Sequence, residues 1–307
     1  MVLPSQVSQR EDKALLGVAM MAFAVTLFTG IDTTAKLLIQ SGLTVFQVVF
    51  IRYFVNFVIV TAMFAPVKGP SVFRSAAPKK QIARSLFFLG SSVLNFAALQ
   101  YLPITMTTTI MFSGPIVVTL LAIPILGEKV GLHRILAVCT GFIGVLVVIQ
   151  PWGVAFHPAV FFSLGAVVCA SLYFIMTRML AGTESNATSQ IWATGIASIC
   201  LAPLALPNWV WPETTMGYVI MVMIGGFGAF GHILATAAHR LADASILAPV
   251  VYIQILLAAI VGVLVFDTWP SWWSLAGGLI IIASGVYIWQ RERAKKRKLP
   301  ARPEALR

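Results

Sequence analysis

The sequence predicts an all-α membrane protein with ten transmembrane helices, arranged as two inverted five-helix repeats. Three observations lead to this prediction: an excess of apolar residues, ten apolar runs of membrane-spanning length, and a similarity between the two halves of the chain. Of the 307 residues, 59% are hydrophobic and only 10% are charged, and the mean hydropathy is +0.92. Because a soluble domain carries about 25% charged residues, the bilayer is the solvent that suits this composition.

The ten apolar runs lie near the length of about 20 residues that is needed to cross the hydrocarbon core. In chain order they cover residues 14–39, 44–65, 82–101, 103–126, 132–149, 157–178, 187–206, 216–238, 244–265 and 271–289. Helices are expected throughout, since a segment in lipid must satisfy its backbone hydrogen bonds internally. The short connections between several runs make successive helices antiparallel.

The distribution of lysine and arginine predicts the orientation of the chain. When the N-terminus is placed in the cytoplasm, every basic residue except Lys36 and Arg52 falls on the cytoplasmic side. The positive-inside rule therefore predicts that both termini are cytoplasmic. The expected location is the inner membrane of a bacterium. We interpret the basic C-terminal end as a topology anchor that faces anionic lipid, with no nucleic-acid partner.

A similarity between the two halves of the chain predicts a duplication. Residues 95–128 align with residues 234–267 without a gap, at a constant offset of 139 residues. Each half then holds five spans, which is an odd number, so the second copy enters the membrane from the opposite side. Inverted repeats with a site at their interface are typical of secondary transporters that work by alternating access. The predicted organisation is an N-terminus (1–13), repeat one (14–149), repeat two (157–289) and a basic tail (290–307).

Several short motifs resemble those of the EamA-type permeases of the drug/metabolite transporter superfamily. The motifs are Asn95-Phe96-Ala97-Ala98-Leu99, Tyr101-Leu102-Pro103, Pro115, Leu126-Gly127-Glu128 and the Gly277–Gly285 segment. The resemblance covers nearly the whole chain and implies a ten-helix transporter with a central cavity that works without ATP. As a mark of this family, Glu128 is expected to have a structural role. Since that family moves amino acids, nucleotide-linked compounds, vitamins and drugs, the resemblance does not identify the cargo.

Asp32, Lys36 and Arg52 lie well inside the predicted spans, where a charged residue costs about 2.5–3.5 kcal/mol on insertion scales. Asp32 and Lys36 are four residues apart on the first span, and Arg52 lies at a similar depth on the second span. A direct pair between Asp32 and Arg52 is feasible, with Lys36 extending toward the outer surface. Two interpretations stay open: an ion pair that joins the first two helices, or a gate that contacts a carboxylate of the substrate.

Eight residues near the middle of the membrane are predicted to bind the substrate: Asn95, Met111, Ser113, Pro115, Tyr173, His232, Tyr252 and Gln254. The run 103–126 is interrupted at Ser113-Gly114-Pro115, where Pro115 lacks a backbone N–H and frees a carbonyl. Gln254 occupies the corresponding position in the second repeat, so we expect broken helices at equivalent positions of the two repeats. Ordinary kinking and interhelical hydrogen bonds are the alternative. His232 is either a hydrogen-bonded core residue or a group that couples transport to protons.

Enzyme and metal signals are absent from the sequence. The four histidines have no paired-ligand spacing, and no GxxxxGK[ST] motif is present. We therefore expect no catalytic residue, no metal and no cofactor. The expected partners are a small-molecule substrate and the lipid bilayer, and the chain is compatible with a monomer.

A cavity with tyrosine, phenylalanine, methionine, glutamine and asparagine suits a zwitterion with an apolar side chain. Within the family that the chain resembles, exporters of amino acids, aromatic ones included, fit this cavity best, and the resemblance therefore makes amino-acid export the leading functional prediction. The first alternative is import of a larger metabolite such as riboflavin or S-adenosylmethionine. An alternative from another class is a membrane-embedded enzyme or a scaffold without transport activity.

Overall fold

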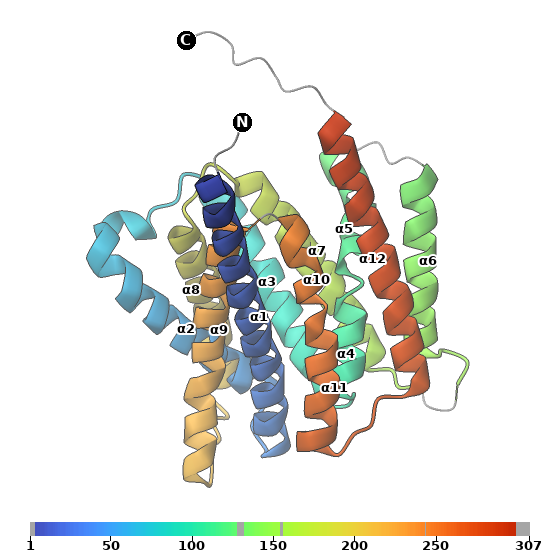
Figure 1. Ribbon diagram of the computed structural model, residues 1–307. Helices are drawn as coiled ribbons and strands as arrows, with labels where there is room; N and C mark the ends of the chain where they lie inside the picture. The colour runs from blue at the N-terminus through green and yellow to red at the C-terminus, as the bar shows by residue number, and fades with distance from the viewer. Residues whose placement is uncertain (1–3, 128–131, 154–155, 243, 299–307) are drawn as a thin grey trace.

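The structure is a computed structural model that describes residues 4–127, 132–153, 156–242 and 244–298. Over these residues it is built from helices, with no strand (Figure 1). In chain order they are α1 (Pro4–Gln40), α2 (Val45–Lys68), the short 3₁₀ helix η1 (Gly69–Phe73), α3 (Pro78–Leu99), α4 (Ile104–Met111), α5 (Gly114–Leu126), α6 (Leu132–Ile149), α7 (Val160–Leu180), α8 (Asn186–Ala205), α9 (Thr215–Leu241), α10 (Ala244–Val251), α11 (Ile253–Phe266) and α12 (Trp272–Lys298).

Each predicted apolar run coincides with one helix, except that two runs are divided in the middle. The run 103–126 forms α4 and α5, so the predicted break around Ser113 is confirmed. Pro115 lies in the first turn of α5, where its missing N–H costs nothing. The run 244–265 forms α10 and α11, with the break at Tyr252. The two breaks correspond under the sequence offset, since Ser113 aligns with Tyr252.

Several helices extend beyond the apolar runs that predicted them. α1 begins at Pro4 and α12 continues to Lys298, so much of the two predicted terminal segments is helical. α3 begins at Pro78, four residues before the run that starts at residue 82. Lysine, arginine, glutamate and glutamine are good helix formers, so a helix continues past the point where hydropathy stops marking it.

Hydroxyl side chains begin three of the long helices. The side chains of Thr44, Ser185 and Thr214 accept a backbone N–H from the first turns of α2, α8 and α9, respectively. This hydrogen bond satisfies one of the N–H groups that a helix start leaves unpaired. The caps fix where these three helices leave their loops, and all three helices contribute to the site described below.

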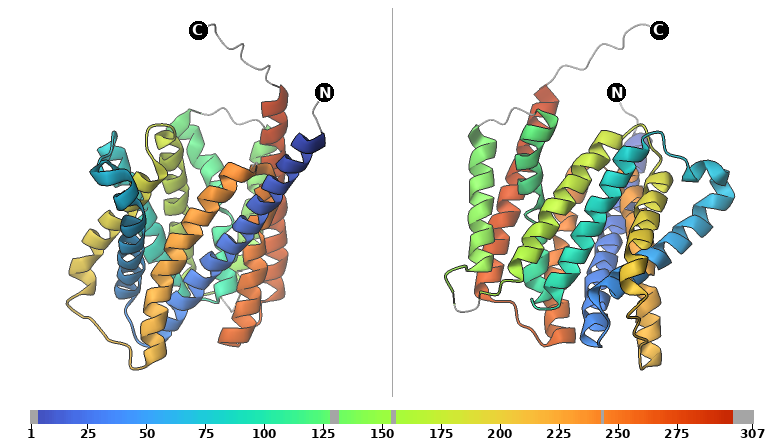
Figure 2. Two further views of the ribbon diagram at one scale, coloured as in Figure 1. Left: turned by 60° about the vertical axis from the view of Figure 1, so that its left-hand side comes forward. Right: turned by 180° about the vertical axis from the view of Figure 1, so that it is seen from behind.

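The helices pack in pairs that run across the two halves of the chain. α1 packs along α9, α3 packs along α7, α2 packs against α8, and α6 packs against α12 (Figures 1 and 2). Under the sequence offset, the pair α1–α9 corresponds to the pair α7–α3, and the other two pairs correspond to themselves. The α6–α12 pair is very close, because a Cβ atom on Gly277 would lie 2.6 Å from the carbonyl oxygen of Gly144.

The outer faces of the helices are apolar. Leu264, Ile199 and Leu279 are among the large hydrophobic side chains that are about 70% exposed or more. Seven helices in the described residues are long and apolar enough to cross a membrane, and parts of α6 and α12 are shorter apolar helices. The main core lies between α1, α2, α3, α8 and α9, and a second core joins α4, α6, α7 and α12. This is the pattern of a multi-pass membrane protein whose apolar surface faces lipid.

Candidate functional site

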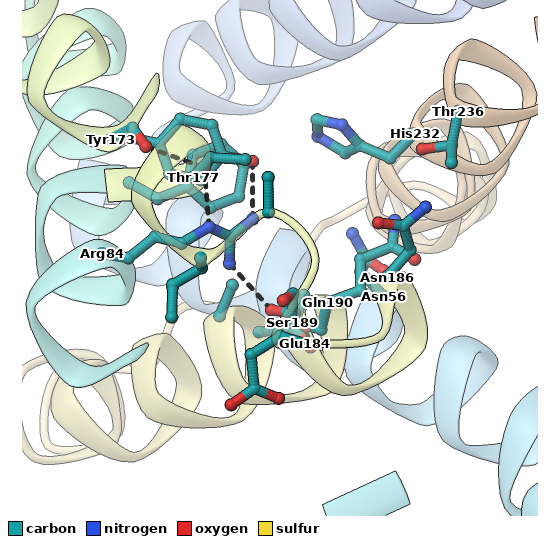
Figure 3. Close-up of a pocket in the computed structure, with 15 residues that line it drawn as sticks. Asn56, Arg84, Tyr173, Thr177, Glu184, Asn186, Ser189, Gln190, His232 and Thr236 are labelled. Carbon is teal, nitrogen blue, oxygen red and sulfur yellow. Dashed lines mark hydrogen bonds between the residues drawn. The ribbon is translucent and has the colours of Figure 1, made fainter. Parts of the chain in front are cut away.

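A cavity of about 200 Å³ lies between α2, α3, α7, α8 and α9 (Figure 3). Its walls combine aromatic rings with amide, hydroxyl and charged groups. It extends from Asn56 and His232 inside the bundle to Ala181 and Glu184 in the connection between α7 and α8. The cavity therefore reaches one end of the bundle, at the side where α3 and α8 begin.

Arg84 forms the charged wall of this cavity. It lies in the second turn of α3 and is only 5% exposed. Its guanidinium donates to the hydroxyl of Thr177 over 2.8 Å, to the hydroxyl of Tyr173 over 3.0 Å and to the carbonyl oxygen of Ser189 over 3.0 Å (Figure 3). All three acceptors are neutral, so no carboxylate among the described residues forms an ion pair with this cation. The arginine joins α3 to α7 and α8.

Glu184 also lines the cavity, but its carboxylate binds other groups than Arg84. Its carboxylate accepts hydrogen bonds from the hydroxyl of Ser75 and, over 3.0 Å, from the backbone N–H of Ala77 at the start of α3. In Figure 3 the carboxylate points away from the guanidinium of Arg84. A carboxylate at a helix N-terminus interacts favourably with the helix dipole, so Glu184 fixes the beginning of α3.

Aromatic rings form the part of the cavity wall that adjoins Arg84. Phe88 stacks on Tyr173 with 4.6 Å between ring centroids and 22° between ring planes. The imidazole of His232 meets Phe88 edge-on at 5.6 Å and packs on Phe28 of α1 at 5.1 Å. Arg84 lies over the Tyr173 ring at 4.6 Å. Of the predicted substrate-binding residues, Tyr173 and His232 thus lie in the wall of this cavity.

Asn56 and Arg52 approach the cavity from α2, and two glycines of α9 make room for them. A Cβ atom on Gly228 would lie 3.0 Å from the amide nitrogen of Asn56 and 4.0 Å from Nε of Arg52. A Cβ atom on Gly225 would lie 2.4 Å from Val55. The amide oxygen of Asn56 and Nε of Arg52 are buried without a hydrogen-bond partner in the described residues. The close contact between α2 and α9 therefore places two open hydrogen-bonding groups beside the cavity.

Asp32 and Arg52 do not form the direct ion pair that the sequence suggested. Asp32 Oδ1 accepts a hydrogen bond from Asn95 over 3.1 Å, and Arg52 donates to the hydroxyl of Ser92 over 2.6 Å. Asn95 and Ser92 are three residues apart and share one face of α3. Each of the two charges therefore contacts a side chain of α3 and not the other charge. The equal depth of the two residues did not imply contact, because counting residues along a helix gives only the position along the membrane normal and not the direction in which a side chain points.

Lys36 binds at the other end of α3. Its ammonium donates to the carbonyl oxygen of Leu102 over 2.6 Å and lies 5.3 Å from the ring centroid of Phe266. Leu102 belongs to the turn between α3 and α4, which is the end of the bundle away from Arg84. The predicted direction of the Lys36 side chain agrees with this contact, and the lysine joins α1 to that turn.

The remaining predicted residues gather at the two helix breaks and do not line this cavity. They are Met111, Ser113, Pro115, Tyr252 and Gln254. The hydroxyl of Ser113 donates to the carbonyl oxygen of Ile110 over 2.7 Å, so it caps its own turn. Tyr252 packs on Phe112 at 5.3 Å. The predicted single site is therefore two groups in the structure. Glu128 lies outside the described residues.

Arg84 is not among the predicted site residues, because it lies close to Lys79 and Lys80 in the chain and was grouped with them as a basic residue on the cytoplasmic side. A signal was available in the helical spacing of the chain. Arg84, Phe88, Ser92 and Asn95 are separated by four, four and three residues, so they share one face of a helix. Three of these four side chains, those of Arg84, Ser92 and Asn95, are polar, and polar side chains on one face of an apolar membrane helix are expected to face the protein interior.

No group of three histidine, cysteine, aspartate or glutamate side chains with the arrangement of a metal site occurs among the described residues. The cavity instead offers aromatic faces, hydrogen-bonding groups and a guanidinium. This set of groups suits the binding of an organic solute with a ring and polar substituents.

Comparison with known proteins identifies the family. Residues 15–150 and residues 157–289 each match the profile of the EamA-like transporter family. The chain belongs to the EamA-like transporter family. The resemblance seen in the sequence motifs is thereby confirmed, and membership supports an integral multi-pass transporter.

The relatives of this EamA-like chain include transporters of two named cargoes. The S-adenosylmethionine uptake transporter of Rickettsia prowazekii is 24% identical over 249 residues, which are 81% of this chain and 84% of the relative. The riboflavin transporter of Vibrio cholerae is 28% identical over 213 residues, which are 69% of this chain and 72% of the relative. A protein of known crystal structure, 19% identical, superposes with a TM-score of 0.59 and covers 94% of this chain and 99% of its own.

These relatives correct the order of the functional predictions. The leading prediction, export of amino acids, is not supported by the transporters named above. The first alternative, import of a larger metabolite such as riboflavin or S-adenosylmethionine, agrees better with them. The solved structure supports the fold alone.

Proposed function

We propose that this protein is a secondary transporter that takes up a metabolite in which a planar heteroaromatic ring is joined to a polar, hydroxylated chain. S-adenosylmethionine and riboflavin, the cargoes in the names of its relatives, both have this form. The distribution of basic residues and the bacterial relatives support a location in the inner membrane with both termini in the cytoplasm.

The observation that carries the proposal is the aromatic wall of the cavity. Phe88, Tyr173 and His232 present ring faces and edges beside the amides and hydroxyls of Asn56 and Thr177. An aromatic contact is worth about 0.5–1.5 kcal/mol beyond the area that it buries. The polar groups then orient the chain that extends from the ring.

The size of the cavity indicates how much of the cargo this conformation holds. Pockets that enclose drug-sized ligands measure roughly 300–1,000 Å³, whereas this cavity measures about 200 Å³. It accommodates a ring system with part of its substituent. The rest of the molecule requires the adjoining interior, toward Arg52 and Asp32, to open.

The transport mechanism that we propose is alternating access by two inverted five-helix repeats. Two observations support it: α4–α5 and α10–α11 break at corresponding positions, and the α1–α9 and α7–α3 pairs exchange under the sequence offset. In this conformation α4 packs on α11, where Thr105 donates to the carbonyl oxygen of Ala258 over 3.4 Å. The corresponding pair, α5 and α10, makes at most marginal contact over the described residues. The cavity would therefore face the cytoplasm.

Uptake into proteoliposomes tests the proposal. Purified protein should accumulate labelled S-adenosylmethionine or riboflavin above the level of empty liposomes. Tyr173→Leu removes the stacking surface and should raise KM roughly tenfold, which corresponds to about 1.4 kcal/mol. Phe161→Leu is the matched control, because Phe161 lies on the same helix and is 65% exposed at its surface. Absence of transport of both compounds by well-folded protein would refute the proposal.

A further inference from the structure

A second group of polar residues lies next to the cavity, farther along α3. It consists of Asp32 with Asn95 on one side and Arg52 with Ser92 on the other. The two groups are continuous, because Phe28 lies one turn from Asp32 on α1 and packs on His232 in the cavity wall. Phe88 likewise lies one turn from Ser92 on α3. The polar interior therefore extends from the cavity to these two charges.

Both charges in this group have unused hydrogen-bonding capacity. Asn95 contacts Oδ1 of Asp32, whereas Oδ2 has no partner among the described residues. Arg52 uses one terminal nitrogen on Ser92, and its Nε is buried without a partner. Asp32 is also the single acidic residue within the ten apolar runs.

The guanidinium of Arg52 is held rigidly in place. It lies 4.9 Å from the ring centroid of Tyr53 and 5.6 Å from those of Phe88 and Phe96. The hydroxyls of Tyr53 and Ser92 are themselves 2.6 Å apart. A charge taken out of water costs several kcal/mol unless it is compensated. The cation and the carboxylate make no direct hydrogen bond to each other, and each keeps an open hydrogen-bonding atom for a third molecule.

The distance between the two charges indicates which charged groups a bound molecule would need. Their partners on α3, Asn95 and Ser92, are three residues apart, so about 5 Å separates the two contact points. An α-amino acid carries an ammonium and a carboxylate on one carbon, at a separation that lets each reach one of these points. A neutral or singly charged head group would leave one of the two buried charges uncompensated.

We propose that Asp32 and Arg52 form a site for the α-amino-acid end of the cargo, with the ammonium at Asp32 and Asn95 and the carboxylate at Arg52 and Ser92. This rests on the proposed function, because the ring of the same molecule lies against Phe88, Tyr173 and His232. The seven residues from Phe88 to Asn95 span about 10 Å along α3, which a ribose and a short aliphatic chain can bridge. The site selects an S-adenosylmethionine type of cargo over riboflavin, which has no amino-acid end.

Ligand-induced thermal stabilisation of the purified full chain tests this site. Three probes are compared: S-adenosylhomocysteine, methylthioadenosine, which keeps the ring and ribose but lacks the amino-acid end, and riboflavin. The wild-type protein should bind S-adenosylhomocysteine at least tenfold more tightly than methylthioadenosine, since hydrogen bonds to charged groups are the strong ones. This comparison needs no variant and so does not depend on whether a variant folds.

Substitutions test whether Asp32 and Arg52 cause the preference for S-adenosylhomocysteine over methylthioadenosine. Asp32→Asn and Arg52→Gln should each lower the affinity for S-adenosylhomocysteine roughly tenfold or more, while the affinity for methylthioadenosine stays within about twofold. Glu213→Gln and Arg74→Gln are the matched controls, because both side chains are exposed outside the bundle interior. Equal losses for both ligands, or no loss for either, overturn the site.

The failure of the site and the failure of the proposed function give different results. Binding of riboflavin or methylthioadenosine as tight as that of S-adenosylhomocysteine overturns the amino-acid site and leaves the proposed function standing. Wild-type protein that is stabilised by none of the three compounds overturns the proposed function, and the site with it.

Discussion

Arg84 illustrates how a single residue organises the site. It carries a buried positive charge on three neutral acceptors from two other helices, α7 and α8. The fork of the guanidinium matches these three directions at once, which an ammonium cannot do. The residue therefore holds Tyr173 and the start of α8 in place around the cavity.

Arg84→Lys should destabilise the protein although it keeps the charge. A lysine can keep about one of the three hydrogen bonds, and each bond to a charged group is worth about 1.5–3 kcal/mol, so a loss of roughly 3 kcal/mol or more is expected. Unfolding in mixed micelles measures it. Arg74→Lys, at an exposed position of the loop before α3, should change stability by less than about 0.5 kcal/mol. Equal stabilities of the two variants would contradict this role of Arg84.

At the residue scale, the sequence predicted how deep a residue lies in the membrane better than it predicted which side chains that residue contacts. Counting along helices placed Tyr173 and His232 in the interior, and the structure puts both in the cavity wall. The same counting placed Gln254 and Tyr252 with them, yet those residues lie at the break between α10 and α11. Position around the bundle depends on helix–helix packing, which the hydropathy of a single sequence does not encode. Arg84 was missed because its neighbours in sequence are loop-like.

At the scale of elements, the contact between α2 and α9 shapes the site. Gly225 and Gly228 let α2 approach so closely that Asn56 and Arg52 reach the interior. In a membrane, small residues at an interface allow packing that lipid exclusion alone would not drive. The distances around Gly225 and Gly228 show packing of this kind.

Gly228→Val should disturb the site, whereas Gly226→Val should not. A Cβ atom at residue 228 meets Asn56 at 3.0 Å, while none of the neighbours of residue 226 lies within 4 Å of an added Cβ. Overpacking a close interface costs about 1–3 kcal/mol, and it would displace α2. Cargo affinity measured by thermal stabilisation should fall for the valine at 228 only. Similar behaviour of the two variants would show that the α2–α9 contact does not shape the cavity.

At the scale of the whole molecule, the two halves are used unequally in this conformation. α4 packs on α11, while α5 and α10 are at most marginally in contact over the described residues. If the repeats are inverted, this asymmetry corresponds to an outer side that is closed and an inner side that is open. The sequence predicted the helices, the two breaks and the family, but one sequence does not specify which of two exchangeable conformations is formed.

Locking the α4–α11 contact should stop transport. A Cβ atom on Gly262 would lie 3.3 Å from the hydroxyl oxygen of Thr105, so Thr105→Cys with Gly262→Cys places two thiols within bonding reach. In a background without Cys139, Cys169 and Cys200, oxidation should abolish uptake into proteoliposomes and reduction should restore it. Each single cysteine variant is the control. Continued uptake by fully oxidised double variant would mean that these half-helices need not separate.

A structure of the protein with bound S-adenosylmethionine tests the central claim most directly. The account predicts ligand density with the adenine ring against Phe88, Tyr173 and His232, and with the amino-acid end directed along α3 toward Asp32 and Arg52. Density at the helix breaks beside Tyr252 and Gln254, with the cavity between α2, α3, α7, α8 and α9 left empty, would contradict it.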